Sequence, residues 1–263
     1  MGVRFSLGAL FKNMQRRRRR QERPRRPLRL IAAAAGGRMG SLVAQLAAKD
    51  PRFELAACLF HKNPIDSEPR VVPAITLEEL GPHLEHADAI IDFSTPEASL
   101  ALAALAAKSK TALVVGTTGF SKAQMSRLKG FSRKTPVFQA PNFSPAVFLL
   151  RRLAREAAGA LTDFDVSISE LHHAAKKDSP SGTALALADS VAQARGGRRP
   201  PVVSQRAGDI VGDHAVLLAG PHERLEIVHR AHARALFARG ALDAALWLSN
   251  RRPGFYGMED MLG

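Results

Sequence analysis

The sequence contains almost no cysteine and no long apolar run. Its single cysteine, Cys58, excludes an internal disulfide, and no Cys/His spacing typical of a metal site accompanies it. A chain without paired cysteines is typical of a reducing compartment, so we expect a cytoplasmic protein. No apolar stretch approaches the ~20 residues that a helix needs to cross a bilayer, so we expect no membrane partner.

Acidic residues are nearly absent from residues 1–27. This segment holds ten lysines and arginines, five of them in the run Arg16–Arg20, against Glu22 alone. Arginine runs neutralise phosphates, so the arm could bind nucleic acid or an acidic membrane surface; an arginine-rich, acid-poor N-terminus also suits an organelle transit peptide. The arginine run lacks the interleaved aromatic residues that stack on bases. We therefore favour a solvated, disordered extension.

From residue 28 onward, short apolar segments alternate with helical patterns. Residues 28–35 are apolar and run into a glycine turn, and apolar residues at helical spacing follow. Further strands are predicted at 53–60, 87–92, 112–115 and 137–139. Capping residues predict helix starts at Thr76–Glu79, Thr95-Pro96, Ser121 with Gln124, and Ser144-Pro145. Strands alternating with helices predict an α/β fold with a Rossmann-type, doubly wound parallel sheet.

The pattern changes after about residue 160. Strands are predicted at 164–169, 216–219 and 225–230, the last two antiparallel, and helices at 183–195 and 236–248. This mixture predicts a second, smaller α+β domain over residues 145–233, for substrate binding and oligomerisation. The dinucleotide-binding domain would then comprise residues 28–144 and a C-terminal segment from about 234 to 263.

A glycine turn joins the first predicted strand to the first predicted helix. Gly37 and Gly40 have the spacing of the last two glycines of the dinucleotide-binding fingerprint, but Ala34 stands in place of the first. Such a turn directs backbone N–H groups and a helix N-terminus toward one point, which attracts a pyrophosphate. Alone, this degraded motif would suit a tight turn in any α/β protein equally well.

The second predicted strand ends without the acidic residue that binds an adenosine ribose. Phe60-His61-Lys62 stands there instead. Lys62 could pair with a 2′-phosphate, which would give a modest preference for NADPH over NADH; otherwise these side chains are merely solvated. Residues 93–96 and 116–120 follow two further strands, at the edge where open α/β sheets bind ligands.

The densest group of reactive side chains lies between Glu170 and Ala184. Two histidines, two lysines and a predicted helix N-terminus share these residues. Backbone N–H groups of Gly182 and Thr183 suit a carboxylate, while Lys176 and a histidine can donate protons or pair with a second carboxylate. The grouping suits a compact dianion that becomes protonated. Lysines crowd the histidines, so we expect no metal.

This segment resembles the core motif of 4-hydroxy-tetrahydrodipicolinate reductases, also called dihydrodipicolinate reductases. Other stretches resemble the same family in the same order: Gly37 to Gly40, Asp92 to Ser94, Gly116 to Phe120, Pro141 to Ser144, Arg206 to Gly212, and Leu246 to Leu248. The resemblance spans residues 28–263. It implies reduction of 4-hydroxy-tetrahydrodipicolinate to tetrahydrodipicolinate with loss of water, using NADPH or NADH, in lysine and diaminopimelate biosynthesis, by a homotetramer.

The resemblance also implies roles for single residues. His172 and Lys176 match the family's catalytic pair, and His173, Gly182 and Thr183 match its substrate contacts. The implied cofactor contacts are Gly37, Arg38, Met39, Gly116, Thr118, Ala140, Asn142 and Phe143. Arg206 matches an arginine of the family's motif, to which we assign no role at this point.

Two departures from the family pattern leave alternatives open. Ala34 replaces a motif glycine, and the segment from about 197 to 205 is shorter than usual, which puts the catalytic rate in question. A catalytically impaired homologue that binds nucleic acid through its arginine-rich arm is one alternative. Another is a different two-domain oxidoreductase, such as an amino-acid dehydrogenase, which would explain the first half but not His172, His173 and Lys176.

Overall fold

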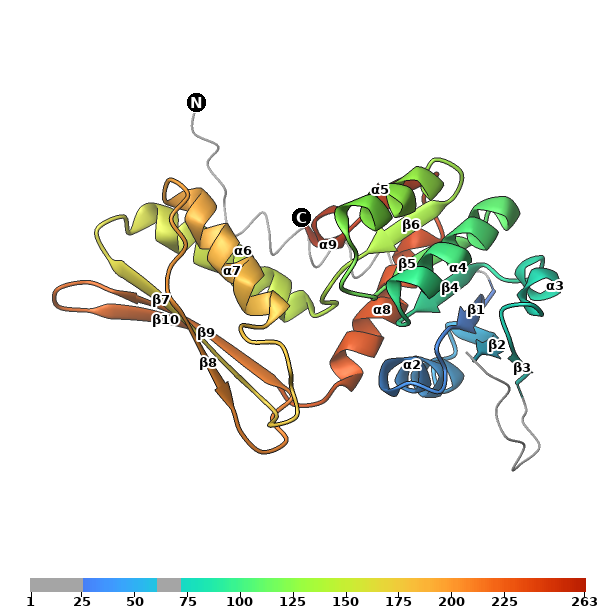
Figure 1. The fold of residues 1–263 in the computed structure, drawn as a ribbon, viewed down its shortest axis with the longest axis horizontal. Coiled ribbons are helices and arrows are strands. Elements are labelled where there is room, and N and C mark those ends of the chain that lie inside the picture. The colour runs from blue at the N-terminus through green and yellow to red at the C-terminus, as the bar shows by residue number, and fades with distance from the viewer. Residues whose placement is uncertain (1–25, 61–71) are drawn as a thin grey trace. The chain divides into compact units, whose positions relative to one another are not determined.

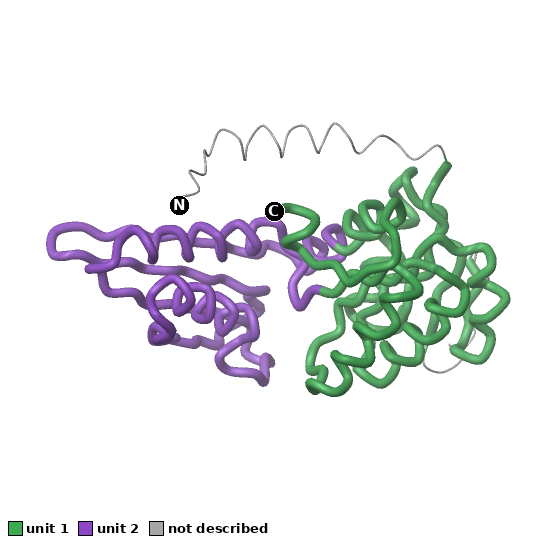
Figure 2. The backbone as a smooth tube through the Cα atoms, turned by 90° about the horizontal axis from the view of Figure 1, so that it is seen from above, with its two compact units in different colours: residues 1–139, 241–263 green, residues 140–240 purple. Residues whose placement is uncertain are grey.

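A computed structural model describes residues 26–60 and 72–263. The chain divides into two compact units, which we treat separately (Figure 1, Figure 2). Unit 1 comprises Met1–Gln139 and Ala241–Gly263, and unit 2 comprises Ala140–Gly240. Among the described residues, no helix is both long and apolar enough to span a bilayer.

Unit 1 is built on a parallel sheet. Its described strands lie in the order β11 (Gly254–Tyr256), β6 (Pro136–Gln139), β5 (Ala112–Val115), β4 (Ala89–Asp92), β1 (Leu28–Ala32), β2 (Phe53–Leu59) and β3 (Ala74–Ile75). All of these neighbours pair in parallel. Every residue of β4 and β5 is buried, as expected for central strands covered by helices on both faces.

Helices cover both faces of this sheet. Helices α3 (Leu80–Leu84), α4 (Pro96–Ser109) and α5 (Lys122–Phe131) share one apolar cluster with strand residues such as Ile90 and Val137. Because Val137 faces that cluster, its neighbour Phe138 points to the opposite face, where it meets Trp247 edge-on at 6.0 Å. Trp247 belongs to α8 (Ala235–Leu248); α2 (Arg38–Ala48) lies on the same side, and α9 (Met258–Leu262) follows β11 (Figure 1).

Unit 2 contains a mixed sheet with helices on one face. The strand order is β10 (Arg224–Ala231), β9 (Gly212–Ala219), β7 (Asp165–His172) and β8 (Val202–Arg206). Strand β9 is antiparallel to both neighbours, and β8 is parallel to β7. Helix α6 (Pro145–Ala160) contacts β9 and β10, and α7 (Gly182–Ala194) contacts β7 and β8. Their shared core includes Ile168 and Val216.

The expected fold class is confirmed, and the differences lie at short elements. The sequence did not predict strands β3, β8 and β11 or helix α9. Each of these strands lies at the edge of its sheet, and each is short, with little periodic pattern in its sequence. The expected helix start at Thr76–Glu79 was wrong in position. Thr76 and Glu79 do bond to each other, but turns follow and α3 begins at Leu80.

Candidate functional site

The first turn of α2 is open to an anion. Gly37 precedes the helix, is exposed, and donates its N–H to Ala34 O at 2.8 Å. No described side chain caps this helix, and first-turn N–H groups have no intrahelical acceptor. Gly40 packs against the carbonyls of Ala33 and Ala34 so closely that any Cβ would collide with them. The turn therefore has the geometry that holds a pyrophosphate at a helix N-terminus.

Ala34 adopts a backbone conformation that glycine normally supplies. Its φ is +53°, in the left-handed region, which costs a non-glycine residue about 1 kcal/mol or somewhat more. The missing fingerprint glycine therefore weakens the turn without abolishing it.

Asp92 joins the loops that follow β4 and β5. Its Oδ1 accepts the N–H of Ser94 at 3.0 Å, and its Oδ2 accepts hydrogen bonds from the hydroxyls of Ser99 and Thr117. Burial raises the pKa of Asp92, and these hydrogen bonds offset only part of that rise. Gly116 lies against the ring of Phe93, where a Cβ would not fit. Buried Asp92 and the ring of Phe93 thus hold both loops in place.

The structure places the predicted cofactor residues in two groups. Gly37, Arg38, Met39, Gly116 and Thr118 lie at carboxyl ends of strands in unit 1, with Gly37, Arg38 and Thr118 exposed. Ala140, Asn142 and Phe143 lie in unit 2, and Lys62 lies outside the described residues.

The unit 2 residues of this set offer few free groups. The side chains of Ala140 and Phe143 are buried, so only their backbone groups can reach a ligand. Asn142 uses its side chain within the unit: Nδ2 donates to Thr183 Oγ1 at 3.2 Å, and Oδ1 accepts the N–H of Ser144. A cofactor role for these three residues stays a prediction.

Unit 2 gathers polar side chains at one end of its helix-covered sheet face. In the strand register, His172 pairs with Arg206 on β8, and Glu170 pairs with His214 on β9. Residues paired across strands point to the same face, and so do residues two apart in one strand. All four side chains therefore lie on the face that also carries Ile168 and the apolar core.

Glu170 stands at the centre of this group. Its Oε1 accepts hydrogen bonds from Arg206 at 2.8 Å and from the N–H of Ser181 at 3.1 Å. Its Oε2 lies 2.5 Å from His172 Nδ1. The ring of His214 packs edge-on against that of His172, and its Nε2 lies 3.3 Å from Ser181 Oγ. Strands β7, β8 and β9 and the start of α7 thus meet at one carboxylate.

These contacts set the charge states. Burial alone would raise the pKa of Glu170, but hydrogen bonds led by that from Arg206 lower it to about 2. Burial lowers the pKa of His172; the Glu170 charge opposes this, while Lys176 and Arg206 add to it. Burial, followed by the charge of His172, lowers the pKa of His214 to about 4. At neutral pH, Glu170 is therefore ionised and His214 is neutral.

The loop after β7 carries Lys176 and is anchored from two sides. The N–H of Ala174 donates to Gly208 O, and Arg206 donates to the backbone carbonyl of Asp178 at 2.7 Å. Lys176 is half-buried and its Nζ donates to Asp178 Oδ1 at 2.7 Å, whereas Lys177 is exposed. Lys176 is thus partly buried and has a carboxylate partner, whereas the side chain of Lys177 faces solvent.

The N-terminus of α7 lies beside this loop. Ser181 caps the helix by accepting the N–H of Ala184 at 3.2 Å, so Gly182 and Thr183 are the first two helical residues. Gly182 is exposed, and a Cβ there would meet nothing within 4 Å. First-turn N–H groups in this position can bind a carboxylate. The structure thus places the predicted residues at the end of β7, in the following loop and at the start of α7, which bonds to Glu170 through Ser181. These residues are His172, half-buried His173, Lys176, Gly182 and Thr183.

Glu170, His172 and His214 also offer metal-ligand atoms within 4.8 Å of one another. However, Arg206 already binds the Glu170 carboxylate, and the charges of Lys176 and Arg206 both act on His172. The positive charges of Arg206 and Lys176 would repel a metal cation bound here, so we interpret the cluster as a hydrogen-bonded acid–base network. The absence of a metal stays a prediction.

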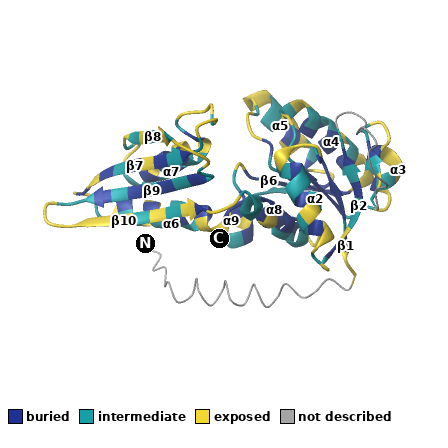
Figure 3. Ribbon diagram, turned by 90° about the horizontal axis from the view of Figure 1, so that it is seen from below, coloured by how far each residue is buried: buried dark blue, intermediate teal, exposed yellow. Residues whose placement is uncertain are grey.

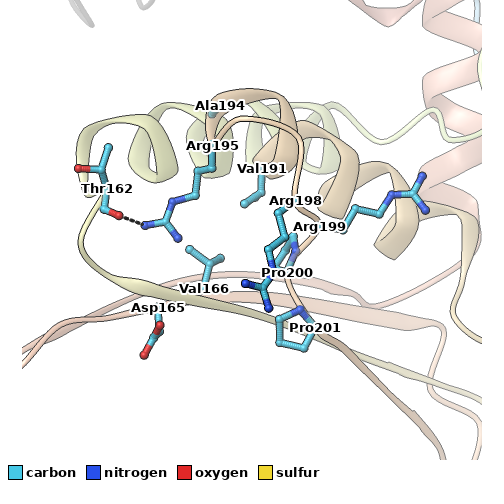
Figure 4. A pocket seen from close by; sticks show the side chains of 10 residues that line it. All are labelled: Thr162, Asp165, Val166, Val191, Ala194, Arg195, Arg198, Arg199, Pro200 and Pro201. Atoms are coloured by element: carbon cyan, nitrogen blue, oxygen red, sulfur yellow. Dashed lines mark hydrogen bonds between the residues drawn. The ribbon is translucent and has the colours of Figure 1, made fainter.

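A separate hollow of about 620 Å³ lies at the other end of the unit 2 sheet (Figure 4). Asp165, at the start of β7, lines it, whereas His172 ends the same strand roughly 23 Å further along at 3.3 Å per residue. Two of the three arginines that line it are engaged: Arg195 donates to the carbonyls of Leu161, Thr162 and Phe164, and Arg199 pairs with Asp189. We assign this hollow no part in the chemistry.

Sequence reasoning missed three residues of the network. Glu170 and Arg206 were quoted within motifs but given no function, because their contact joins positions 36 residues apart. His214 was not singled out, although it falls on the buried alternation of β9 together with Val216 and Leu218. A histidine at a buried strand position was the available signal.

Comparison with known proteins gives a consistent result. Residues 28–143 match the family model "Dihydrodipicolinate reductase, N-terminus", and residues 146–262 match "Dihydrodipicolinate reductase, C-terminus". The chain is 39% identical to the 4-hydroxy-tetrahydrodipicolinate reductase of Aquifex aeolicus, over 89% of this chain and 98% of that one. It is 44% identical to the enzyme of the same name from Stenotrophomonas maltophilia, over 89% and 97%.

Solved structures agree. A dipicolinate-bound dihydrodipicolinate reductase from Paenisporosarcina superimposes with a TM-score of 0.77 and 25% identity, covering 89% of this chain and 99% of that one. A DAP dehydrogenase from C. glutamicum gives a TM-score of 0.56 at 12% identity, covering 90% and 96%, which shows a shared fold alone.

Proposed function

The chain belongs to the dihydrodipicolinate reductase family, and we propose that it reduces 4-hydroxy-tetrahydrodipicolinate to tetrahydrodipicolinate with loss of water, using NADPH or NADH. The proposal rests on two observations made together. The chain is 39–44% identical to these reductases over 89% of its length, and unit 2 brings Glu170, His172 and Lys176 into one acid–base cluster. This reaction serves lysine and diaminopimelate biosynthesis. The lone cysteine favours a cytoplasmic location.

Unit 1 fits a nicotinamide dinucleotide. When bound, this cofactor supplies the hydride. The uncapped first turn of α2 would hold the pyrophosphate through backbone N–H groups, and exposed Arg38 adds positive charge there. The loop at Gly116 and Thr118, fixed through Asp92, offers a hydroxyl and close backbone approach to the nicotinamide. These contacts account for binding and orientation; the proton chemistry belongs to unit 2.

Unit 2 fits a small dicarboxylate. The N–H groups of Gly182 and Thr183 would bind one carboxylate, with the dipole of α7 adding to the attraction. His173 and Lys176 would meet the other; Lys176 would exchange Asp178, its partner in the free protein, for the substrate. The reaction takes up one hydride and one proton and releases one water. Lys176 and His172 would supply that proton and balance the charge of the dianion.

We further propose a modest preference for NADPH. Phe60 directly follows β2, where a ribose-binding acid would stand, and a phenyl ring cannot accept hydrogen bonds from a ribose diol. Lys62, two residues later, would pair with a 2′-phosphate. A single exposed contact of this kind is worth about 1 kcal/mol, or about fivefold in kcat/KM. Lys62→Ala should remove the preference, and a clear preference of the native chain for NADH would contradict it.

A homotetramer assembled through unit 2 is also part of the proposal. Among the described residues, helices α6 and α7 cover one face of the four-stranded sheet, and the strand register puts Val203, Leu217 and Val228 on the other (Figure 3). Val203 is 51% exposed and Val228 is 40% exposed. Light scattering on the purified chain should give the mass of a tetramer, and Val203→Lys with Val228→Lys should lower it.

Complementation tests the proposed activity as a whole. The gene should restore diaminopimelate-independent growth to a bacterium that lacks its own reductase. A chain carrying Lys176→Ala, expressed to the same level, should not. Growth in neither case, with soluble protein present, would favour the alternative of a catalytically impaired homologue.

A further inference from the structure

We propose that Glu170 and Arg206 are a positioning pair. The pair fixes the imidazole of His172 so that its Nδ1–H donates a hydrogen bond to the Glu170 carboxylate, and it anchors the loop that carries Lys176. His172 Nε2 then becomes the atom that exchanges a proton with the substrate. This inference rests on the proposed roles of His172 and Lys176, and it assigns a function to an arginine whose motif match had suggested none.

The tautomer follows from the burial of two atoms. Glu170 Oε2 and His172 Nδ1 are buried and lie 2.5 Å apart, and no other described residue offers a hydrogen-bond partner to His172 Nδ1. The Ser204 hydroxyl also acts on the Glu170 carboxylate, so the nitrogen decides the tautomer. A buried polar atom without a partner costs about 1–3 kcal/mol, so His172 Nδ1 must be satisfied by this carboxylate. Glu170 is ionised at neutral pH because its pKa is about 2, so it can only accept. His172 must therefore donate from Nδ1, which leaves Nε2 as the titrating nitrogen.

Gly212 keeps the Nε2 side of the ring open. A Cβ at position 212 would stand 2.8 Å from His172 Nε2 and 3.0 Å from the neighbouring carbon of the ring. The absence of a side chain on this residue of β9 thus leaves room beside the nitrogen that the pair frees for chemistry.

Arg206 connects both proposed proton donors. The same terminal nitrogen donates to Glu170 Oε1 at 2.8 Å and to the backbone carbonyl of Asp178 at 2.7 Å, and the other terminal nitrogen donates to Gln205 O at 2.6 Å. Through Glu170 it acts on His172, and through Asp178 on the loop of Lys176. A guanidinium can make these directed contacts together, whereas the single ammonium of lysine has no planar fork to match them.

The charges around His172 predict the direction in which its pKa moves when Glu170 loses its charge. Glu170 on the same strand favours the protonated ring, and Arg206 on β8, Lys176 in the following loop and burial oppose it, while His214 on β9 is neutral. Glu170→Gln keeps the shape and an acceptor oxygen but removes the negative charge. The limb of the kcat–pH profile that belongs to His172 should therefore move to lower pH, and kcat at neutral pH should fall by about tenfold or more.

Kinetics can separate positioning from general damage. In Glu170→Gln the affinity for NADPH should stay within about twofold, because the partners of Glu170 are Arg206, Ser181 and His172, none of which is a proposed cofactor contact. If Glu170 acts through His172, adding Glu170→Gln to His172→Ala should reduce kcat little further. Arg206→Lys should lower kcat in the same direction. The matched controls are Glu226→Gln and Arg224→Lys, an exposed Glu–Arg pair on β10 of the same unit, which should leave kcat and its pH profile unchanged.

Nitrogen NMR of the full chain with labelled histidine tests the tautomer directly and does not depend on turnover. The native protein should show His172 protonated at Nδ1, and Glu170→Gln and Arg206→Lys should show a mixture or the other tautomer. An Nε2-protonated His172 in the native protein would overturn the proposal, as would an unshifted pH profile in a folded Glu170→Gln chain. If the native chain shows the expected tautomer but no turnover, the proposed function fails while the positioning pair stands.

Discussion

In the proposed mechanism, unit 1 would offer its ligand mostly backbone groups, whereas unit 2 would offer charged side chains that a buried network holds in place. In unit 1, the key positions are Gly37, Gly40 and Gly116, where the main chain must come close to another group. In unit 2, Glu170 binds Arg206, Ser181 and His172, and Lys176 has its own carboxylate partner. The site in unit 1 requires positions without a side chain, whereas the site in unit 2 requires specific charged side chains.

This difference bears on the departure from the family pattern at Ala34. Ala34 can replace a glycine in unit 1 because the backbone still reaches the required conformation, at the expense of some strain. In unit 2, one removed charge leaves a buried partner without compensation, which is costlier than the loss of an exposed contact. We therefore expect substitutions in unit 2 to affect chemistry, and substitutions in unit 1 to affect binding and stability.

The largest expected effect is that of Lys176→Ala. Losing a transition-state contact of this kind should cost about 3–4 kcal/mol, or 10²–10³-fold in kcat, while the affinity for NADPH stays near normal. Lys177→Ala is the matched control, because Lys177 is exposed and should contribute little. Steady-state kinetics with fluorescence titration of NADPH measure both quantities. Similar kcat values for Lys176→Ala and the native chain would remove Lys176 from the mechanism.

The second prediction concerns acid stability, in which the units should differ. The pKa of His214 is about 4 in the folded protein and about 6.5 when unfolded, so the unfolded state binds the proton more tightly. Stability is therefore present in full above pH 6.5 and is lost as the pH falls toward 4, by roughly 3 kcal/mol. The raised pKa of Asp92 in unit 1 has the opposite sign, because there the folded state retains the proton more tightly.

Hydrogen exchange at several pH values, corrected for the intrinsic rate, measures this difference. Peptides from β7 and β9 should lose protection between pH 6.5 and pH 4, and His214→Gln should reduce the loss. Peptides from β4 and β5 should not follow His214. Equal loss in both units, unchanged by His214→Gln, would contradict the assignment of acid sensitivity to unit 2.

The third prediction tests the close packing in unit 1. Gly40→Ala places a methyl group against the carbonyls of Ala33 and Ala34, so the turn must shift. Overpacking of this kind should cost about 2 kcal/mol of stability and weaken NADPH binding. Gly130→Ala in α5 is the control, since a Cβ there meets nothing within 4 Å and alanine favours a helix. Thermal melts and NADPH titrations should separate the two variants; equal behaviour would refute the packing argument.

The smallest expected effect is a gain. Ala34→Gly relieves the left-handed strain and should stabilise the chain by about 1 kcal/mol, a rise of a few degrees in Tm. kcat should not change, because Ala34 contributes no group to unit 2. A lower Tm for this variant would show that the positive φ of Ala34 carries no strain.

The sequence predicted what local patterns encode. Thr95, Ser121 and Ser144 cap their helices as expected, because capping depends on residues three positions apart. The antiparallel pairing of residues 216–219 with 225–230 is confirmed by the register of Val216 with Ile227. The chemical segment around His172 was also located from sequence alone, although the roles of its residues remain predictions.

Long-range contacts could not be predicted from the sequence. The position of Arg206 beside His172 depends on β8 pairing with β7, and β8 is a short strand at the sheet edge with little periodic signal. The pairing of Glu170 with His214 likewise depends on the register of β7 with β9. The sequence therefore predicted which side chains would react, a prediction that stays open, but the groups that set their charge and orientation emerged only from the folded sheet.

Turnover by the purified full-length chain tests the central claim most directly. NADPH oxidation should be followed in the presence and absence of enzymatically generated 4-hydroxy-tetrahydrodipicolinate, with Lys176→Ala in parallel. The account predicts substrate-dependent oxidation by the native chain, and its loss in Lys176→Ala while NADPH binding persists. Native protein that binds NADPH but shows no substrate-dependent oxidation would contradict the assignment of this chain as an active reductase.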